Sequence, residues 1–297
     1  MSNPYQNAYN FFREDYARTL FPLTTNQLIL EHGHRRIGDF IYRRITHAEG
    51  STCCFLAQER AYAAKHRNHL RRTVKLDPVA EFFIYEIVYR HRSRFRPAVF
   101  PNRQSFGFRF SSGSPISASQ GYFEYKSAIS TAREQFRYAA RFDISSYFNS
   151  IYRSDLARGF SEAAKHEEDT AIFGKFLRQI NSGRSIDCLT QGLMATKIIG
   201  ADYLKFVDNS PRLESEQYFR FMDDFYLFSD DINKLNRDFI LIQRLLGEKG
   251  LSINPAKTEI GEIGDDSINR GVDAVRSGLL RRRRVRIHSE YFDDGEE

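Results

Sequence analysis

Two adjacent carboxylates, Asp223 and Asp224, lie between two apolar, aromatic-rich runs within residues 218–228. The flanking residues have high β propensity and partly alternate in polarity, so they predict two strands joined by a tight turn. Asp is favoured in such turns. Two crowded carboxylates repel each other unless a proton or a cation lies between them. The pair therefore indicates a divalent metal site, because carboxylate oxygens are the ligands that Mg²⁺ prefers.

A third carboxylate, Asp143, stands 80 residues upstream, where the strand-like stretch 137–142 ends. If this strand lies beside the hairpin, Asp143 and Asp223 face each other across two metal ions about 3.5 to 4 Å apart, the arrangement that serves in-line phosphoryl transfer. The pattern therefore predicts a centre for two Mg²⁺ ions, with Mn²⁺ as an alternative ion. The alternative interpretation is a solvated loop, of which an isolated Asp-Asp pair is more often a part.

The elements that must position these carboxylates are predicted from periodicity. Residues 1–60 have helical periodicity, and Pro78 is expected to start a helix that contains i, i+4 apolar pairs. The Ser-, Gly- and Pro-rich stretch 111–119 predicts a loop. After the hairpin, an amphipathic helix is expected from about residue 232 to 248, ended by Gly250.

A second acidic pair, Asp230 and Asp231, lies directly before this last helix. Carboxylates at a helix N-terminus accept hydrogen bonds from free backbone N–H groups and interact favourably with the helix dipole. We therefore expect this pair to cap the helix.

The chain of 297 residues has a net charge of +6, and its basic residues are unevenly distributed. Residues 65–109 contain 11 basic residues against 3 acidic ones, a surplus of +8, with aromatic side chains between them. This combination suits a nucleic-acid strand, with cations near phosphates and aromatic faces near bases. Arg103 and Arg109 are candidate contacts to nucleic acid. The alternative is a solvated basic face over ordinary core aromatics.

Length and composition predict a globular protein with a substantial core, divided into two or three subdomains. No apolar run reaches the roughly 20 residues that a membrane span needs, and the N-terminus has no signal-peptide core. The 3 cysteines have neither a disulfide spacing nor a zinc spacing. We expect a soluble, intracellular protein with no membrane partner.

Four short stretches combine these residues in a particular order: 143–148 (DISSYF), 190–192 (TQG) with a helix-like run after it, 221–224 (FMDD) and 251–258 (LSINPAKT). In content and order they resemble the palm motifs of reverse transcriptases. Ahead of them, residues 71–78 and 105–109 resemble finger segments of the bacterial enzymes. The resemblance spans about residues 65–262, most of the chain.

Within that family, residues 143–152 and the Arg-rich segment that ends at Asp77 and Pro78 look most like bacterial abortive-infection and other defence-associated reverse transcriptases. The resemblance implies a cytoplasmic bacterial protein. A retron or group II intron type is the alternative, although Thr190 stands where those enzymes usually carry Pro. Some members of the defence group extend DNA without a template and prime on their own protein, so the use of a template stays open.

The resemblance implies an α+β fold, with a right-hand polymerase palm built from an antiparallel sheet with helices, and with largely helical fingers. The expected divisions are an N-terminal helical extension (1–60), fingers (61–135), palm (136–262) and a basic and acidic tail (263–297). Only about 35 residues follow Glu262, and two packed helices of a thumb need more. The thumb is therefore expected to be absent or reduced, or to come from a partner chain or a second copy of this chain.

The resemblance also implies roles at the metal centre. Asp143 and Asp223 are expected to hold both metals, together with the backbone carbonyl of Ile144. Asp224 is expected to be a supporting ligand. Lys257 is expected to protonate or neutralise the departing pyrophosphate, while the metals lower the pKa of the attacking 3′ hydroxyl.

Other positions are expected to contact the incoming nucleotide. Three basic residues are candidates for gripping its triphosphate: Arg71, Arg72 and Lys75. The developing negative charge on the phosphates needs positioned cations of this kind. Phe148 stands where related enzymes place an aromatic that excludes a ribose 2′ hydroxyl, so a preference for dNTPs is expected. Gln191 and Gly192 are expected to contact the nucleotide and the nascent base pair.

The implied activity is that of an RNA-directed DNA polymerase, a nucleotidyltransferase that adds dNTPs to a 3′ hydroxyl with or without an RNA template, in antiphage defence. Its partners are dNTPs and an RNA strand, a DNA strand, or both. The alternative is a palm module that binds nucleic acid or a partner polymerase without catalysis. The three carboxylates and Lys257 favour catalysis, since a binding module gains nothing from acids clustered opposite a polyanion.

Overall fold

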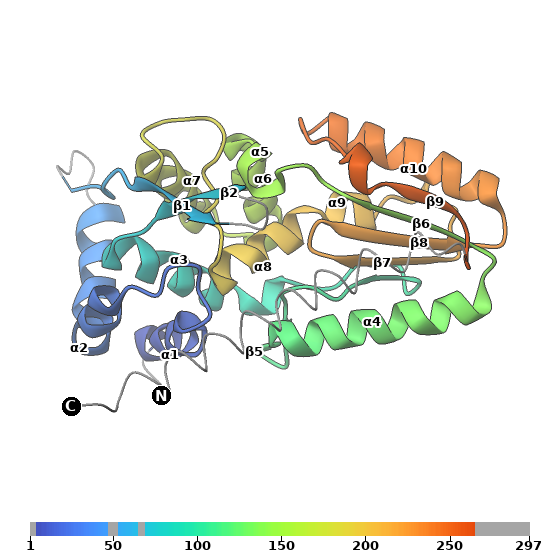
Figure 1. The fold of residues 1–297 in the computed structure, drawn as a ribbon. Helices are drawn as coiled ribbons and strands as arrows, with labels where there is room; N and C mark the ends of the chain where they lie inside the picture. Colours follow the sequence, from blue (N-terminus) through green and yellow to red (C-terminus); the bar gives the residue numbers. More distant parts are fainter. Residues whose placement is uncertain (1–3, 47–52, 65–68, 265–297) are drawn as a thin grey trace, which may run out of the picture.

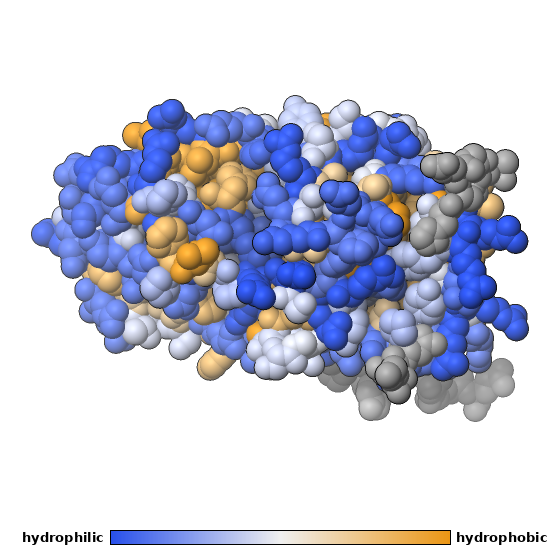
Figure 2. Space-filling view, turned by 180° about the vertical axis from the view of Figure 1, so that it is seen from behind, coloured by the Kyte–Doolittle hydropathy of each residue, from blue (hydrophilic) through white to orange (hydrophobic). Residues whose placement is uncertain are grey.

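The computed structural model describes residues 4–46, 53–64 and 69–264 (Figure 1). The predicted tail beyond residue 264 lies outside the described residues, and so do Lys65 and Arg67 of the basic segment. None of the helices within the described ranges is long and apolar enough to cross a membrane. Figure 2 shows hydrophilic side chains over most of one face, with apolar side chains in smaller patches.

Residues 4–46 are largely helical, as predicted, and pack on the helix that Pro78 starts, whereas residues 53–60 of the segment predicted to be helical contain no helix. The elements of the N-terminal part are α1 (Pro4–Tyr16), α2 (Thr24–Phe40), a π-helical turn η1 (Ile41–Thr46), the hairpin β1 (Glu59–Ala64) and β2 (Leu70–Lys75), and α3 (Pro78–Arg90). The Asp77 carboxylate accepts hydrogen bonds from the N–H groups of Val79 and Ala80, which fixes the start of α3. The Asp15 carboxylate joins α1 to this core by accepting from the Tyr85 hydroxyl at 2.5 Å.

Five strands form the central sheet, in the order β3-β7-β8-β6-β9. They are β3 (Arg103–Ser105), β6 (Tyr138–Asp143), β7 (Gln217–Phe221), β8 (Asp224–Ser229) and β9 (Glu259–Glu262). Four of them pair antiparallel, as predicted for a palm. The edge strand β3 runs parallel to β7, so the sheet is mixed. Because β3 lies within the predicted fingers, the sheet also crosses the expected boundary at residue 135.

One long helix covers each face of this sheet (Figure 1). On one face, α10 (Ile232–Gly247) packs over a core that includes Phe142 and Phe225. On the other, α4 (Ala118–Gln135) packs over a smaller core that includes Phe219 and Phe228. Side chains alternate between the faces along a strand. Asp143 and Asp224 therefore belong to the face that α4 covers.

The remaining elements connect the fingers to the sheet. They are η3 (Arg92–Arg94), β4 (Phe110–Ser111), β5 (Ser114–Pro115), α5 (Tyr147–Ser150), α6 (Arg153–Ala164), α7 (Glu167–Ile180), α8 (Met194–Tyr203), α9 (Lys205–Asp208) and η4 (Pro255–Lys257). The stretch predicted as a loop at residues 111–119 contains most of the short β4-β5 hairpin and the start of α4. Its Gly113 has a φ of +82°, which suits the tight turn between the two strands.

The helix predicted after the β7-β8 hairpin is confirmed as α10, and Gly250 follows its end with a φ of +68°. The Asp231 carboxylate caps it, as expected, by accepting from the N–H of Asn233 at 2.8 Å. Asp230 has a different function. Its carboxylate accepts from the N–H of Arg137 at 2.9 Å and so holds the start of β6.

Glu81 in α3 is expected to make the stability of the fold depend on pH. Burial raises the pKa of Glu81 to about 7. A hydrogen bond from Asn26 at 2.5 Å lowers this pKa, and the charges of Asp15 and Asp77 raise it further. The stability that a neutral Glu81 contributes is present below about pH 4.5 and is lost as the pH rises through about 7. A Glu81→Gln variant stays neutral. It is therefore expected to be more stable than the wild type above pH 7, by about 3 kcal/mol.

Urea unfolding of both proteins at pH 5 and pH 8 checks this expectation. The exposed Glu134 in α4 supplies the matched control, Glu134→Gln, which should follow the wild type at both pH values. A stability difference between Glu81→Gln and the wild type that is equal at both pH values would contradict it.

Candidate active site

The hairpin between β7 and β8 brings the three predicted carboxylates to one end of the sheet. Asp143 lies directly opposite Asp224 in the β6-β8 register. Phe221 pairs with Asp224, so Met222 and Asp223 alone form the turn. The N–H of Ile144 donates to the carbonyl of Asp223 at 3.2 Å and fixes the turn beside the end of β6. Strand pairing thus places residues 80 positions apart side by side.

The turn has a strained backbone at its first position. Met222 has a φ of +58°, in the left-handed region that non-glycine residues rarely adopt. The Met222 side chain is buried, and a Cβ added at Gly107 would lie only 3.1 Å from the Met222 nitrogen. Close packing therefore holds the turn in a conformation that costs about 1 to 3 kcal/mol. Strain of this kind fixes the direction in which Asp223 points.

Burial and neighbouring charges both act on the carboxylates of the turn. Burial raises the pKa of Asp223 to about 7, and the charges of Asp224 and Asp143 add to the effect. Burial also raises the pKa of Asp224, with Arg141 opposing and Asp143 reinforcing the shift. Without a cation, the site therefore favours a partly protonated state near neutral pH.

Lys257 reaches this cluster from the segment that was predicted to be the fourth motif. The N–H of Asn254 donates to the carbonyl of Asp143 at 2.8 Å, and Ile253 forms a bridge with Ile144. These contacts place the Lys257 Nζ 2.5 Å from the Asp143 Oδ2. Partial burial opposes the charge on Lys257, but the bond to Asp143 and the neighbouring carboxylates outweigh it and raise the pKa of Lys257.

The donor set fits a divalent cation. The Asp143 Oδ1 is buried and has no hydrogen-bond partner among the described residues, while Oδ2 contacts Lys257. A buried carboxylate oxygen without a partner is unfavourable, and a cation would satisfy it. Across residues 4–46, 53–64 and 69–264, no group of three or more His, Cys, Asp or Glu side chains lies close enough together to hold a metal ion. Metal binding by Asp143, Asp223, Asp224 and the carbonyl of Ile144 stays a prediction.

The basic candidates on β2 lie at the edge of the fingers. Arg71, Arg72 and Lys75 are exposed on this strand. The Arg72 Nε pairs with an Asp187 carboxylate oxygen at 2.8 Å, so part of its guanidinium is already engaged. Contact with a triphosphate stays a prediction for all three.

Gln191 connects the fingers to the palm. Its side-chain amide donates to the carbonyl of Arg72 at 3.1 Å and to the Asn149 Oδ1 at 2.7 Å. Its backbone N–H donates to the Thr73 hydroxyl at 2.8 Å. Asn149 in turn donates to Asp187, the partner of Arg72. Gln191 therefore positions β2 against α5, a function that the sequence did not indicate.

Gly192 and Phe148 have packing constraints of their own. Gly192 has a φ of +108°, and a Cβ added there would lie 2.4 Å from the Cβ of Leu20. The glycine is therefore required for the N-terminal segment to pack on α8. The ring of Phe148 lies over Gly200, where an added Cβ would be 3.3 Å from it. Phe148 is partly exposed, and its predicted contact with the nucleotide sugar is not tested by this packing.

Arg103 requires a correction. It was predicted to contact nucleic acid, but it is buried, and its guanidinium donates to the carbonyls of Asp208 and Leu213, both at 3.1 Å. This arginine therefore stabilises the loop before β7. Arg109 is also engaged, because it pairs with Glu124 at 2.5 Å and donates to the carbonyl of Phe106 at 2.7 Å.

A buried ion pair behind the hairpin was not predicted from the sequence. Arg220 in β7 is fully buried, and its Nε donates to the Asp208 Oδ1 at 2.8 Å. The Arg220 Nη1 also donates to the carbonyl of Met222 at 2.9 Å, inside the turn between β7 and β8. The sequence did contain an indication, since an arginine between two phenylalanines in a buried strand needs a buried partner.

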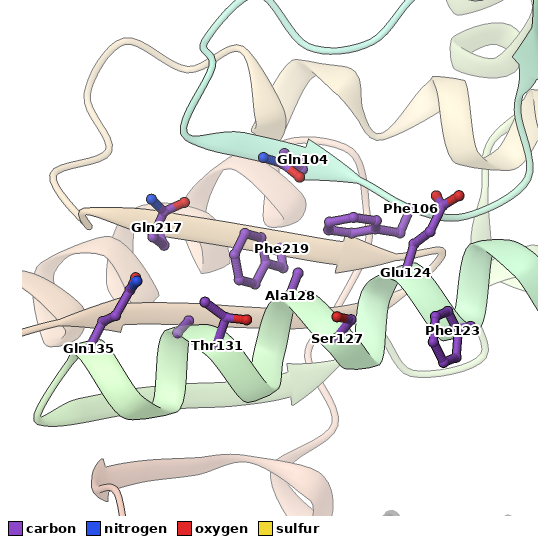
Figure 3. A pocket seen from close by; sticks show the side chains of 11 residues that line it. Gln104, Phe106, Phe123, Glu124, Ser127, Ala128, Thr131, Gln135, Gln217 and Phe219 are labelled. Carbon is purple, nitrogen blue, oxygen red and sulfur yellow. The ribbon is translucent and has the colours of Figure 1, made fainter.

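A groove of about 460 Å³ lies between α4 and the strands β3 and β7 (Figure 3). Phe106 and Phe219 lie at the strand side of it, and Ser127, Ala128 and Thr131 face them from the helix. None of the predicted catalytic residues lines this groove. It is therefore separate from the carboxylate cluster.

The fold of the chain is similar to that of solved telomerase structures. None of the curated protein sequences matches the chain. Telomerase from Candida tropicalis, in complex with a TWJ fragment of telomeric RNA, has a TM-score of 0.51 and 13% identity and covers 73% of this chain and 42% of its own. Apo telomerase from Candida tropicalis has a TM-score of 0.49 and 10% identity and covers 81% of this chain and 50% of its own. The chain thus spans half or less of these telomerases.

The family is shown by the sequence itself. A family profile described as "Reverse transcriptase (RNA-dependent DNA polymerase)" matches residues 100–277, more than half of the chain. The matched region contains the hairpin, Asp143 and Lys257, and the mixed sheet between helices is the palm that the profile implies. The chain belongs to the reverse transcriptase family.

Proposed function

We propose that the chain is an active polymerase that adds dNTPs to a 3′ hydroxyl with two divalent metal ions, directed by an RNA strand or without a template. The observation that supports this most is the cluster at the end of β6 and β8. There Asp143 lies opposite Asp224, its Oδ2 contacts Lys257, and its Oδ1 is buried without a hydrogen-bond partner among the described residues. A protein that only bound nucleic acid would gain nothing from acids placed there, because they repel phosphates.

The carboxylates and the lysine of the cluster have different proposed functions. Asp143, Asp223 and Asp224 would hold the ions and thereby position the 3′ hydroxyl and the triphosphate. Bound Mg²⁺ would lower the pKa of the hydroxyl and stabilise charge on the leaving group. Lys257 stays protonated because its pKa is raised. Its ammonium is therefore available to neutralise or protonate the departing pyrophosphate.

The fingers would supply the triphosphate contacts. Arg71, Arg72 and Lys75 are exposed on β2, and Gln191 holds this strand against α5. A positioned cation stabilises the charge that develops on the phosphates. We propose that this strand closes on the triphosphate and that Gln191 sets its distance from the carboxylates.

The biological setting is proposed from the motifs. Residues 143–152 resemble those of bacterial defence-associated enzymes, which supports a cytoplasmic enzyme of antiphage defence that uses dNTPs with an RNA or DNA strand.

Labelled dNTP incorporation tests the proposed activity. The full chain is incubated with Mg²⁺ or Mn²⁺, with an RNA template and DNA primer, with a primer alone and without nucleic acid. Incorporation that Asp223→Asn abolishes and Asp230→Asn preserves is the expected result. Mass spectrometry of the product shows whether nucleotides are attached to the protein itself. No incorporation in any arm by a folded protein would favour the non-catalytic alternative.

Phe148→Ala is expected to weaken the preference for dNTPs over rNTPs. If its ring blocks the ribose 2′ hydroxyl, removing it should raise relative ribonucleotide incorporation by about 10- to 100-fold, the range that steric discrimination in a pocket supplies. Competing labelled dNTP and rNTP substrates measure this ratio. Phe123→Ala, at a side chain that is 74% exposed on α4, is the matched control and should leave it unchanged. An unchanged ratio in Phe148→Ala would remove Phe148 from the nucleotide site.

A further inference from the structure

A second cavity, of about 420 Å³, lies apart from the carboxylate cluster. It is bounded by α6, by the turn η3 that follows α3, by α8 and α9, and by Lys249 beyond α10. None of the predicted catalytic or nucleotide-binding residues lines it. Its volume is within the range of sites for small molecules and is larger than a single phosphate needs.

The charges around this cavity are mainly positive. Lys205 pairs with Asp202, and Lys249 lies 3.5 Å from Asp155, so these two cations are matched by two acids. Four more cations line the cavity: Arg94, Arg96, Arg158 and Lys165. All four are exposed, and no carboxylate of the described residues lies within ion-pair distance of them. Glu162 is the remaining acid at the cavity, which leaves a positive surplus.

Tyr203, whose hydroxyl is a hydrogen-bond donor, also lines this cavity. Its side chain is 8% exposed and lines the cavity, and its hydroxyl is buried with no hydrogen-bond partner in the described part of the chain. Gly159 leaves room for the ring, since a Cβ there would lie 3.2 Å from it. A buried hydroxyl without an acceptor is unfavourable. The missing acceptor would be supplied by an anion among the four cations.

We propose that this cavity binds an anion with more than one phosphate group, to which the Tyr203 hydroxyl donates while Arg94, Arg96, Arg158 and Lys165 neutralise the charge. Arginine suits this ligand because its guanidinium donates two parallel hydrogen bonds to phosphate oxygens. The phosphates belong either to a small molecule, such as pyrophosphate or a nucleoside triphosphate, or to consecutive phosphates of a single RNA strand. Both sources present the same chemistry to the cavity.

Calorimetric titration of the full chain in EDTA tests the site, because the carboxylate cluster cannot hold phosphates through metal ions under that condition. The probes are pyrophosphate and a short single-stranded RNA, added separately. We expect Arg158→Gln and Tyr203→Phe each to weaken binding of at least one probe by about 10-fold. The exposed Arg244 on α10 supplies the control, and Arg244→Gln should bind as the wild type does.

Thermal unfolding without any anion adds a second measurement. Tyr203→Phe removes only the unsatisfied hydroxyl, so its unfolding midpoint should equal or exceed that of the wild type. A lower midpoint would show that the hydroxyl already has a partner and would overturn its assigned role. The Lys165→Gln variant, at an exposed side chain, tests the cations without changing the core.

The outcomes separate this site from the proposed polymerase centre. Binding of either probe that Asp143→Asn preserves and Arg158→Gln weakens supports the cavity, and the probe that binds identifies the source of the phosphates. The proposal is overturned if Asp143→Asn weakens binding while three other variants leave it unchanged: Arg158→Gln, Lys165→Gln and Tyr203→Phe. Failure of both probes to bind the wild type also overturns it, whether or not the chain polymerises.

Discussion

An Asp143→Asn variant is expected to incorporate labelled nucleotides at least about 10³-fold more slowly than the wild type. Asp143 lies opposite Asp224 at the strand end, and its Oδ1 is the buried oxygen that has no partner among the described residues. An amide has one neutral carbonyl oxygen in place of the two anionic oxygens of a carboxylate, so it cannot hold two cations together. Single-turnover incorporation at saturating dNTP measures the loss.

Folding and chemistry can be separated in this variant. The Lys257 side chain that pairs with Asp143 is 63% exposed, so losing the pair should change stability by less than about 1 kcal/mol. Asp230→Asn is the matched control, because the Asn side chain can still accept from the N–H of Arg137. Wild-type rates in Asp143→Asn would refute the assigned centre. Equal losses of incorporation rate in Asp143→Asn and Asp230→Asn would instead indicate a general folding defect.

An Arg220→Met variant is expected to lose about 3 to 5 kcal/mol of unfolding free energy. Arg220 and Asp208 are almost fully buried, with side-chain exposures of 0% and 1%, and Tyr218 also donates to Asp208 at 2.6 Å. Removing the guanidinium leaves the Asp208 carboxylate as a buried charge without its counter-ion. Urea unfolding, read from the midpoint and the slope, measures the change.

The exposed pair of Arg237 and Glu214 gives the comparison. These side chains are 55% and 47% exposed, so Arg237→Met should cost less than about 1 kcal/mol. Adding Asp208→Asn to Arg220→Met should restore part of the lost stability, because the unpaired charge is removed. A loss in Arg220→Met as small as that in Arg237→Met would show that the pair contributes little. Because Arg220 also binds the carbonyl of Met222, its loss should reduce activity as well.

The sequence was sufficient to predict the hairpin, the neighbouring strand and the helices α3 and α10. These elements depend on local rules: alternation along strands, Asp in turns, and caps such as Asp77 and Asp231. The ordered motifs then indicated that β6 lies beside the hairpin. The register of β6 and β8 then brings the carboxylates together, since it places Asp143 opposite Asp224.

The sequence was not sufficient where an interaction depends on tertiary packing. β3 has only 3 residues and pairs in parallel with a strand more than 100 residues away, so no local periodicity marks it. Arg103 was interpreted as a surface cation. Its acceptors are backbone carbonyls, which every residue carries, so the sequence does not indicate that it has buried partners. The bonds of the Gln191 amide to Arg72 and Asn149 likewise depend on tertiary packing, and its predicted contact with the nucleotide stays a prediction.

The parallel pairing of β3 with β7 determines how the chain can be recombined with its relatives. A chimera that exchanged residues 136–262 alone would separate β7 from its edge partner and leave unpaired N–H and C=O groups beside Phe219. Such an open edge recruits strands from other molecules. Transplants that keep residues 100–264 as one block would preserve the whole sheet, and the fingers hairpin β1-β2 could then be exchanged independently.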